Sequence, residues 1–113
     1  MTSFIVIDDD RTVRSVLIKI IEQYSLGDVC AEADNGLLGE ELILRYKPDI
    51  VIIDLLLPHQ DGMSIIKKVK SLNVKSMFIM LSQVSDKDMI ARAYEMGIEF
   101  FISKPINVIE VVN

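Results

Sequence analysis

The most informative stretch of this 113-residue sequence is IVIIDLLLP, residues 50–58, an aliphatic run interrupted by the carboxylate of Asp54. An unpaired charge at the end of a buried strand is costly, which indicates that Asp54 has a partner or a chemical role. A second apolar run, FIVI at residues 4–7, leads directly into Asp8, Asp9 and Asp10. Two parallel strands would bring these carboxylates to one edge of a sheet, the edge where open α/β sheets bind ligands.

Apolar blocks and amphipathic blocks alternate along the rest of the chain. Strand-like runs occupy residues 4–7, 29–33, 50–53, 77–81 and 98–102. Helical periodicity occupies residues 13–24, 37–46, 64–72 and 87–96, and Gly97 ends the last of these in the left-handed conformation. This alternation predicts an α/β fold, a doubly wound five-stranded parallel sheet with the flavodoxin-like order 2-1-3-4-5.

The chain length and its last residues predict one domain of a longer protein. Residues 107–110, NVIE, carry the pattern of a capped helix start, and the sequence ends at Asn113. An apolar helix of about one turn is not stable by itself. We therefore expect residues 1–113 to be a single domain with a truncated final helix.

Composition limits the classes of partner and the compartment. Half of the residues are hydrophobic and the net charge is -5, so the chain can bury a core and lacks the basic surface that binds nucleic acid. Any DNA contact must therefore come from another part of the protein. The single cysteine, Cys30, is expected to be a small core residue. The sequence has neither a signal peptide nor an apolar span, which predicts a cytoplasmic protein without a membrane partner.

Polar side chains at the predicted strand ends indicate phosphoryl transfer to a carboxylate. Asp8, Asp9 and Asp54 would lie together, and three adjacent carboxylates need a cation. Oxygen ligands favour Mg²⁺. Ser82 ends the fourth strand and Lys104 ends the fifth, so a hydroxyl donor and an ammonium would stabilise a phosphoryl group that Asp54 attacks.

These residues resemble the receiver (CheY-like) domain of two-component response regulators. The resemblance covers residues 4–107 and is carried by Asp8-Asp9, Asp54-x-x-x-Pro58-x-x-Asp61-Gly62, Ser82 and Lys104-Pro105. Residues 82–84 and 97–107 further resemble the receivers of glutamine-sensing transcriptional regulators from Bacillus.

The resemblance implies a role for each matching position. Asp54 becomes the phosphoacceptor, Lys104 the phosphoryl-binding lysine and Ser82 the switch hydroxyl. The Mg²⁺ ligands become Asp9, Asp8 acting partly through water, Asp54 and the backbone carbonyl of Leu56. Lys104-Pro105 is expected to be a cis peptide.

The resemblance also implies a signalling switch rather than an enzyme. A sensor histidine kinase would donate the phosphoryl group to Asp54. A face formed by helix 4, strand 5 and helix 5 would change its affinity for partners and would also serve as a homodimer surface. An output domain beyond Asn113, DNA-binding and transcriptional by resemblance, would carry the response.

Four positions depart from the common receiver pattern. Gln83 occupies a usually small position and would crowd the phosphoryl group or donate an amide hydrogen bond to it. Leu56 and Val84 are apolar where many receivers orient an attacking water, so we expect slow self-dephosphorylation. Phe101 replaces a switch aromatic that is commonly Tyr. Because Phe has no hydroxyl, a rotation of its ring would change packing contacts but no side-chain hydrogen bond.

The other polar residues and the methionines are expected to have structural roles. Asp10 is expected to cap the first helix, Asp61-Gly62 to shape a turn, and His59 to be solvated. The methionines at positions 77, 80, 89 and 96 are expected to fill the core.

Three other functions remain as alternatives. A phosphohydrolase with an aspartate nucleophile lacks its second acid, because Leu56 stands in that place. A flavodoxin-like cofactor binder is disfavoured because Asp8, Asp9 and Asp10 would repel phosphate. The remaining alternative is a phosphorylation-independent receiver that acts as a protein-interaction module.

Overall fold

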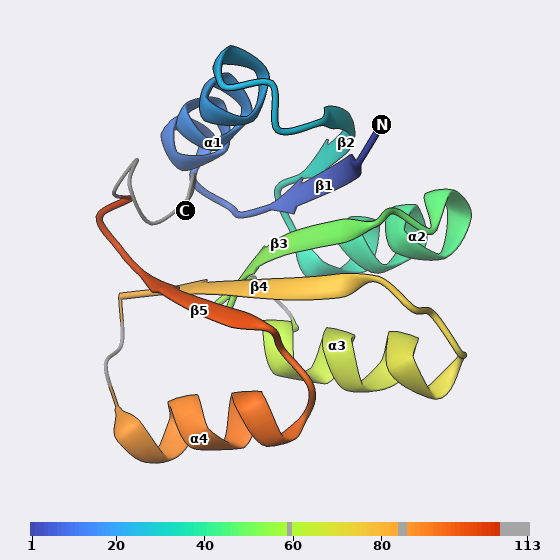
Figure 1. The fold of residues 1–113 in the computed structure, drawn as a ribbon. Helices are drawn as coiled ribbons and strands as arrows, with labels where there is room; N and C mark the ends of the chain where they lie inside the picture. Colours follow the sequence, from blue (N-terminus) through green and yellow to red (C-terminus); the bar gives the residue numbers. More distant parts are fainter. Residues whose placement is uncertain (59, 84–85, 107–113) are drawn as a thin grey trace.

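A parallel sheet lies at the centre of the structure, a computed structural model that describes residues 1–58, 60–83 and 86–106 (Figure 1). Its strands are β1 (Ser3–Ile7), β2 (Asp28–Ala33), β3 (Ile50–Asp54), β4 (Met77–Ser82) and β5 (Phe100–Ser103). Their order is β2-β1-β3-β4-β5, which confirms the predicted doubly wound topology. From β1 the chain passes to β2 on one side, then crosses back over β1 to β3 on its other side, so the switch point lies between β1 and β3.

Helices cover both faces of this sheet. They are α1 (Arg11–Gln23), α2 (Gly36–Tyr46), α3 (Gly62–Ser71) and α4 (Lys87–Glu95). Figure 1 shows α1 on one side and α2, α3 and α4 on the other. Leu17 and Ile21 of α1 pack with Val6 and Ile52, whereas Ile65 of α3 belongs to the second apolar cluster. The central strands are therefore buried on both faces, as their continuous apolar sequences require.

Aspartate and asparagine side chains begin the four helices of the described residues. Asp10 accepts hydrogen bonds from the N–H groups of Thr12 and Val13, which confirms its predicted role as the cap of α1. Asp61, predicted to shape a turn, is the N-cap of α3 and accepts from the Ser64 N–H at 2.8 Å. These caps fix the loops that follow β1 and β3.

Glycine is required at position 62 because the backbone of β3 lies too close for a side chain, and not because of an unusual φ angle. A Cβ at this position would overlap the carbonyl oxygen of Asp54 and approach the Leu55 Cα. Gly97, in contrast, has a φ of 104°, which confirms its predicted left-handed conformation. The absent side chain at Gly62 therefore lets the start of α3 pack directly against the end of β3.

Some predicted core positions are wrong. Cys30 is exposed because β2 is an edge strand whose residues alternate between solvent and the sheet interior. Met77 is also exposed, although its neighbours Ser76 and Phe78 are buried, whereas Met80 is fully buried. Helix α1 buries Ile21 but leaves Tyr24, part of its predicted apolar face, about half exposed.

Three sequence predictions fall outside the described residues: the helix start at residues 107–110, the environment of His59 and the position of Val84. The fifth strand begins at Phe100 rather than at the predicted residue 98. Among the helices that are described, none combines the length and the apolar character needed to span a membrane.

Candidate functional site

The carboxyl edge of the sheet gathers the predicted functional residues. Asp8 directly follows β1, Asp54 ends β3, Ser82 ends β4 and Lys104 directly follows β5. All five strands of the described chain are parallel, so these positions lie on the same edge. Side chains separated by up to about a hundred residues in sequence therefore meet in one place.

Three carboxylates form the acidic part of this edge. One oxygen from each of Asp8, Asp9 and Asp54 lies within 4.8 Å of the others, as the sequence predicted. Asp8 is fully buried and Asp54 is 6% exposed, while Asp9 lies at the surface. The two buried charges need compensation, because like charges in a dry environment repel strongly.

Lys104 supplies that compensation. Its ammonium lies 2.8 Å from Asp8 Oδ2 and 2.9 Å from Asp54 Oδ2. Burial by itself would lower the pKa of Lys104, but the interactions with Asp8 and Asp54 outweigh it and raise the pKa above its usual value. Lys104 is therefore a cation held between two carboxylates.

Backbone contacts fix the orientation of the lysine and of the carboxylates. The Lys104 N–H donates to the Ser82 carbonyl at 2.9 Å, and the Lys104-Pro105 peptide is cis, as predicted. The Leu56 N–H donates to Asp54 Oδ1 at 3.2 Å, and the Asp10 N–H donates to Asp8 Oδ1 at 2.8 Å. Each buried carboxylate thus has one oxygen held by the backbone and the other by Lys104.

The remaining predicted residues surround this centre. Ser82 is 1% exposed, Gln83 is exposed, and the Leu56 side chain is 59% exposed. Phe101 is half-buried against the core on the side of α4, and its N–H donates to the Tyr94 hydroxyl at 3.1 Å. The roles of the Leu56 carbonyl as a metal ligand and of Gln83 as a modulator stay predictions.

Sequence reasoning missed two side chains near the site. Arg14 on α1 donates from Nη1 to the Asp8 carbonyl at 2.7 Å and from Nε to Glu32 on β2 at 2.8 Å. Tyr94 on α4 was also missed, because nothing in its sequence position indicates that it contacts β5. The only signal for Arg14 was its place in the first turn of a helix that begins beside Asp8.

The donor set is suited to a divalent cation. The cluster of Asp8, Asp9 and Asp54 offers carboxylate oxygens, which are the ligands that Mg²⁺ prefers over nitrogen or sulfur. Asp9 is exposed, and the ion pairs of Lys104 with the described residues are with Asp8 and Asp54, so the lysine does not compensate the charge of Asp9. The residues present therefore fit the predicted metal.

This arrangement of sheet, acidic cluster and lysine defines a receiver-type α/β domain. The chain belongs to the family described as the response regulator receiver domain, whose sequence model matches residues 4–113. It is 46% identical over 110 residues to the transcriptional regulatory protein GlnL of Bacillus subtilis. That alignment covers 96% of this chain and 35% of GlnL, so the chain spans about a third of that relative.

Further comparisons agree on the family and the fold. The chemotaxis protein CheY of Bacillus subtilis is 32% identical over 116 residues, an alignment that covers 100% of this chain and 97% of CheY. Among solved structures, the CheX-CheY-BeF3-Mg complex from Borrelia burgdorferi contains a chain with a TM-score of 0.93 and 19% identity, covering 98% of this chain and 84% of that one. The receiver domain of NarL from Mycobacterium tuberculosis gives a TM-score of 0.92 at 24% identity, with coverage of 98% and 90%.

Proposed function

We propose that this chain is the phosphoacceptor switch of a two-component system and that a histidine kinase phosphorylates Asp54. The observation that carries the proposal is the pairing of a buried carboxylate with a lysine whose side chain is 10% exposed, beside two further carboxylates. A purely structural role would not need three carboxylates at one strand edge. Family membership supports the proposal, since receivers of response regulators interact with histidine kinases.

The chemistry is an in-line transfer to a carboxylate oxygen. Asp54 attacks the phosphorus of a phosphohistidine, an O–P bond forms, and the P–N bond breaks with its electron pair returning to the imidazole. Lys104 and the Ser82 hydroxyl stabilise the charge on the phosphoryl oxygens. Mg²⁺, held by Asp8, Asp9, Asp54 and the Leu56 carbonyl, supplies further positive charge when it is bound.

The acyl phosphate then alters contacts that reach the surface. Phosphorylation adds a phosphoryl group to a carboxylate oxygen of Asp54, so Lys104, which pairs with Asp54 in the unmodified protein, and Ser82 are drawn toward the new phosphoryl oxygens. The backbones of these two residues are joined by the hydrogen bond from the Lys104 N–H to the Ser82 carbonyl, so a displacement of one would affect the other. Phe101 on β5 and its Tyr94 contact transmit the change to the face built from α4 and β5.

The proposal extends to the output domain that would carry out the response. We expect the full-length protein to be a cytoplasmic transcriptional regulator that binds DNA through a separate output domain. Similarity to GlnL and to other curated transcriptional regulators supports this. The acidic charge of this chain, -5, supports DNA contact through another domain. Homodimerisation would use the face formed by α4, β5 and the predicted final helix.

Intact mass after incubation with Mg²⁺ and a small phosphodonor tests the proposal. We expect the wild type to gain one phosphoryl mass, Asp54→Asn to gain none, and Asp49→Asn, at the opposite end of β3, to behave like the wild type. Omission of Mg²⁺ should abolish the gain. A wild-type protein that binds Mg²⁺ but gains no mass would instead support the phosphorylation-independent interaction module.

The lifetime of the phosphorylated form tests the predicted slow hydrolysis. The Leu56 side chain is exposed beside Asp54 and has no group that can orient a water. We expect Leu56→Asn to shorten the lifetime, measured by loss of the added mass over time, and Leu56→Met to leave it unchanged. Fast hydrolysis in the wild type would contradict the prediction.

A further inference from the structure

Arg14 contacts the main chain of the loop that carries two of the proposed Mg²⁺ ligands. Its backbone N–H donates to the Asp10 carbonyl at 3.1 Å, and its side-chain Nη1 donates to the Asp8 carbonyl at 2.7 Å. These contacts lie at either end of a short loop, with Asp9 between them. One residue of α1 therefore holds the main chain on both sides of Asp9.

The guanidinium of Arg14 is itself anchored to the sheet. The Arg14 side chain is 13% exposed, and its Nε donates to Glu32 Oε1 on β2 at 2.8 Å. Glu32 precedes Ala33, whose carbonyl accepts from the Asp8 N–H at 3.1 Å. Because an arginine presents its donors in a rigid planar fork, a bond at Nε fixes the direction of Nη1. The position of the Asp8 carbonyl is thus tied to β2 through the Arg14 side chain.

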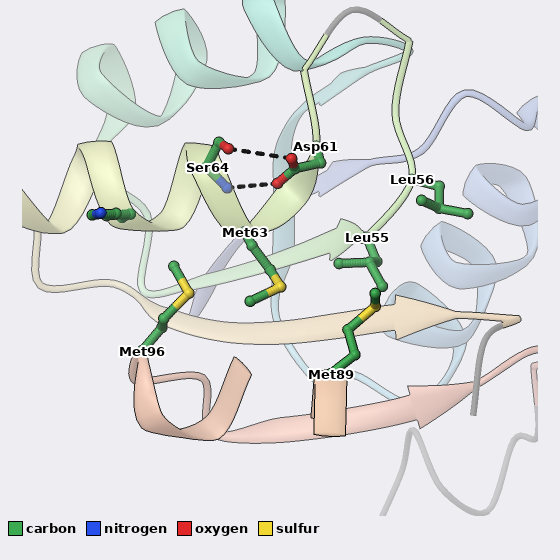
Figure 2. A pocket seen from close by; sticks show the side chains of 8 residues that line it. Leu55, Leu56, Asp61, Met63, Ser64, Met89 and Met96 are labelled. Atoms are coloured by element: carbon green, nitrogen blue, oxygen red, sulfur yellow. Dashed lines mark hydrogen bonds between the residues drawn. The ribbon is translucent and has the colours of Figure 1, made fainter. Parts of the chain in front are cut away.

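The loop after β3 is held in a different way. Asp61 accepts hydrogen bonds from the Ser64 N–H at 2.8 Å and from the Ser64 hydroxyl at 3.2 Å, so a residue of this loop caps α3 (Figure 2). The Asp54 carboxylate of β3 is buried and paired with Lys104. Asp9, in contrast, is exposed and lies outside the two ion pairs that Lys104 makes with described residues. The orientation of the Asp9 carboxylate therefore depends on the main chain that carries it.

We propose that Arg14 is a positioning residue, which aims the Asp9 carboxylate at the cation site by fixing the main chain around it. This inference rests on the proposed function, because it concerns the Mg²⁺ site of that function. Groups that orient metal ligands without touching the metal commonly change its affinity by about tenfold or more. The positive charge of the guanidinium acts in the opposite direction, since it repels a cation. Removal of Arg14 therefore separates positioning from charge by the sign of the effect.

Mg²⁺ titration followed by the amide NMR signals of the protein measures that sign. We expect Arg14→Met to weaken Mg²⁺ binding about tenfold, because the main chain around Asp9 is released. The control Arg11→Met removes the same charge from an exposed residue in the first turn of the same helix, and it should leave the affinity unchanged or slightly raised. Arg14→Lys keeps the charge but lacks the fork, so its affinity should lie between those of Arg14→Met and the wild type. Unchanged or tighter binding by Arg14→Met would overturn the proposal.

Amide hydrogen exchange in the presence of a chelator tests the same contact without metal. The Asp10 N–H donates to Asp8 Oδ1 at 2.8 Å, so its exchange rate reports whether the loop is ordered. In Arg14→Met we expect this amide to exchange about tenfold faster, and the Leu56 N–H, which is bonded to Asp54, to be unaffected. Equal acceleration of the two amides would show that Arg14 stabilises the domain as a whole and would overturn the positioning role.

A double-mutant cycle tests the anchoring of Arg14 by Glu32. Glu32→Gln removes the charge that holds the guanidinium, so it should weaken Mg²⁺ binding more in the wild-type background than in Arg14→Met. Equal weakening in both backgrounds would show that Glu32 acts on the cation by charge alone. That result would overturn the anchoring contact.

The results for Arg14 are separable from those for the proposed phosphorylation. A wild-type protein that binds Mg²⁺ but gains no phosphoryl mass would count only against the proposed function, and the titration would still decide the role of Arg14. A wild-type protein that does not bind Mg²⁺ would overturn both. In protein that is phosphorylated, Arg14→Met should raise the Mg²⁺ concentration for the half-maximal rate of mass gain and leave the rate at saturating Mg²⁺ unchanged. A lower rate at saturation with the same half-maximal concentration would contradict a role in Mg²⁺ binding.

Discussion

Strand β3 is preceded by Asp49 and ends at Asp54, and these two aspartates differ in burial and in the partners of their carboxylates. Asp49 precedes the strand, is exposed, and its Oδ2 accepts hydrogen bonds from the Ser3 N–H at 2.8 Å and the Ser3 hydroxyl at 3.2 Å. Asp54 ends the strand, is buried, and is paired with Lys104 at 2.9 Å. One carboxylate is satisfied by a neighbouring chain segment, and the other needs a distant cation.

This difference shows why only one edge of the sheet is suited to bind a ligand. At the amino edge, the hydrogen bond from the Ser3 backbone is the main reason that the pKa of Asp49 is lowered, and the site is complete without a ligand. At the carboxyl edge, Asp8 and Asp54 share one lysine, and Asp9 adds a third carboxylate that the lysine does not compensate. An incoming cation or phosphoryl group therefore changes the charge balance only at the carboxyl edge.

The largest effect on stability is expected from Lys104→Met. The variant keeps the length of the side chain but leaves Asp8 and Asp54 without their cation. We expect the free energy of unfolding without Mg²⁺ to fall by about 3–5 kcal/mol. Mg²⁺ should restore part of this loss, because a bound cation compensates the same carboxylates.

Urea unfolding with chelator and with Mg²⁺ measures both effects. Lys19→Met, which removes an exposed lysine on α1, is the matched control and should change stability little. A loss for Lys104→Met no greater than for this control would contradict the strong dependence of the carboxyl edge on one cation.

An intermediate effect is expected from adding a methyl group at each edge. In Gly62→Ala the new Cβ would meet the Asp54 carbonyl oxygen, and in Gly27→Ala it would meet the Thr2 carbonyl oxygen at the amino edge. Both variants should lose about 1–3 kcal/mol of stability through overpacking. Only Gly62→Ala should also slow phosphorylation of Asp54, measured as the rate of mass gain. Equal phosphorylation rates in the two variants would show that Asp54 tolerates displacement of its backbone.

The smallest effect is expected from Asp49→Asn, which keeps the shape of the side chain and removes its charge. Because the pKa of Asp49 is lowered in the folded protein, its charge stabilises the fold above the usual carboxyl pKa of about 3.9. That contribution is lost as the pH falls through the folded pKa. Thermal unfolding of both proteins should therefore show a small difference at neutral pH that disappears in acid. A difference that grows toward acidic pH would contradict this sign.

The sequence by itself determined the order of the elements and the positions of the acidic residues. Strand β3 and strand β1 were identifiable because continuous apolar runs in a short α/β chain are typical of buried parallel strands. Asp8 and Asp54 could be assigned to one edge because parallel strands place their carboxyl ends together. The cap Asp10 and the left-handed Gly97 were predictable because each depends on a few adjacent residues.

Only the tertiary structure decided which side chains touch. The Lys104–Asp54 contact spans 50 residues, and its geometry depends on the register of β3, β4 and β5. The contact of Arg14 with the Asp8 carbonyl depends on how α1 packs on the sheet. The exposure of Cys30 likewise follows from the place of β2 at an edge of the sheet. Periodicity records the face on which a residue lies, but packing between distant segments sets its neighbours and its access to solvent.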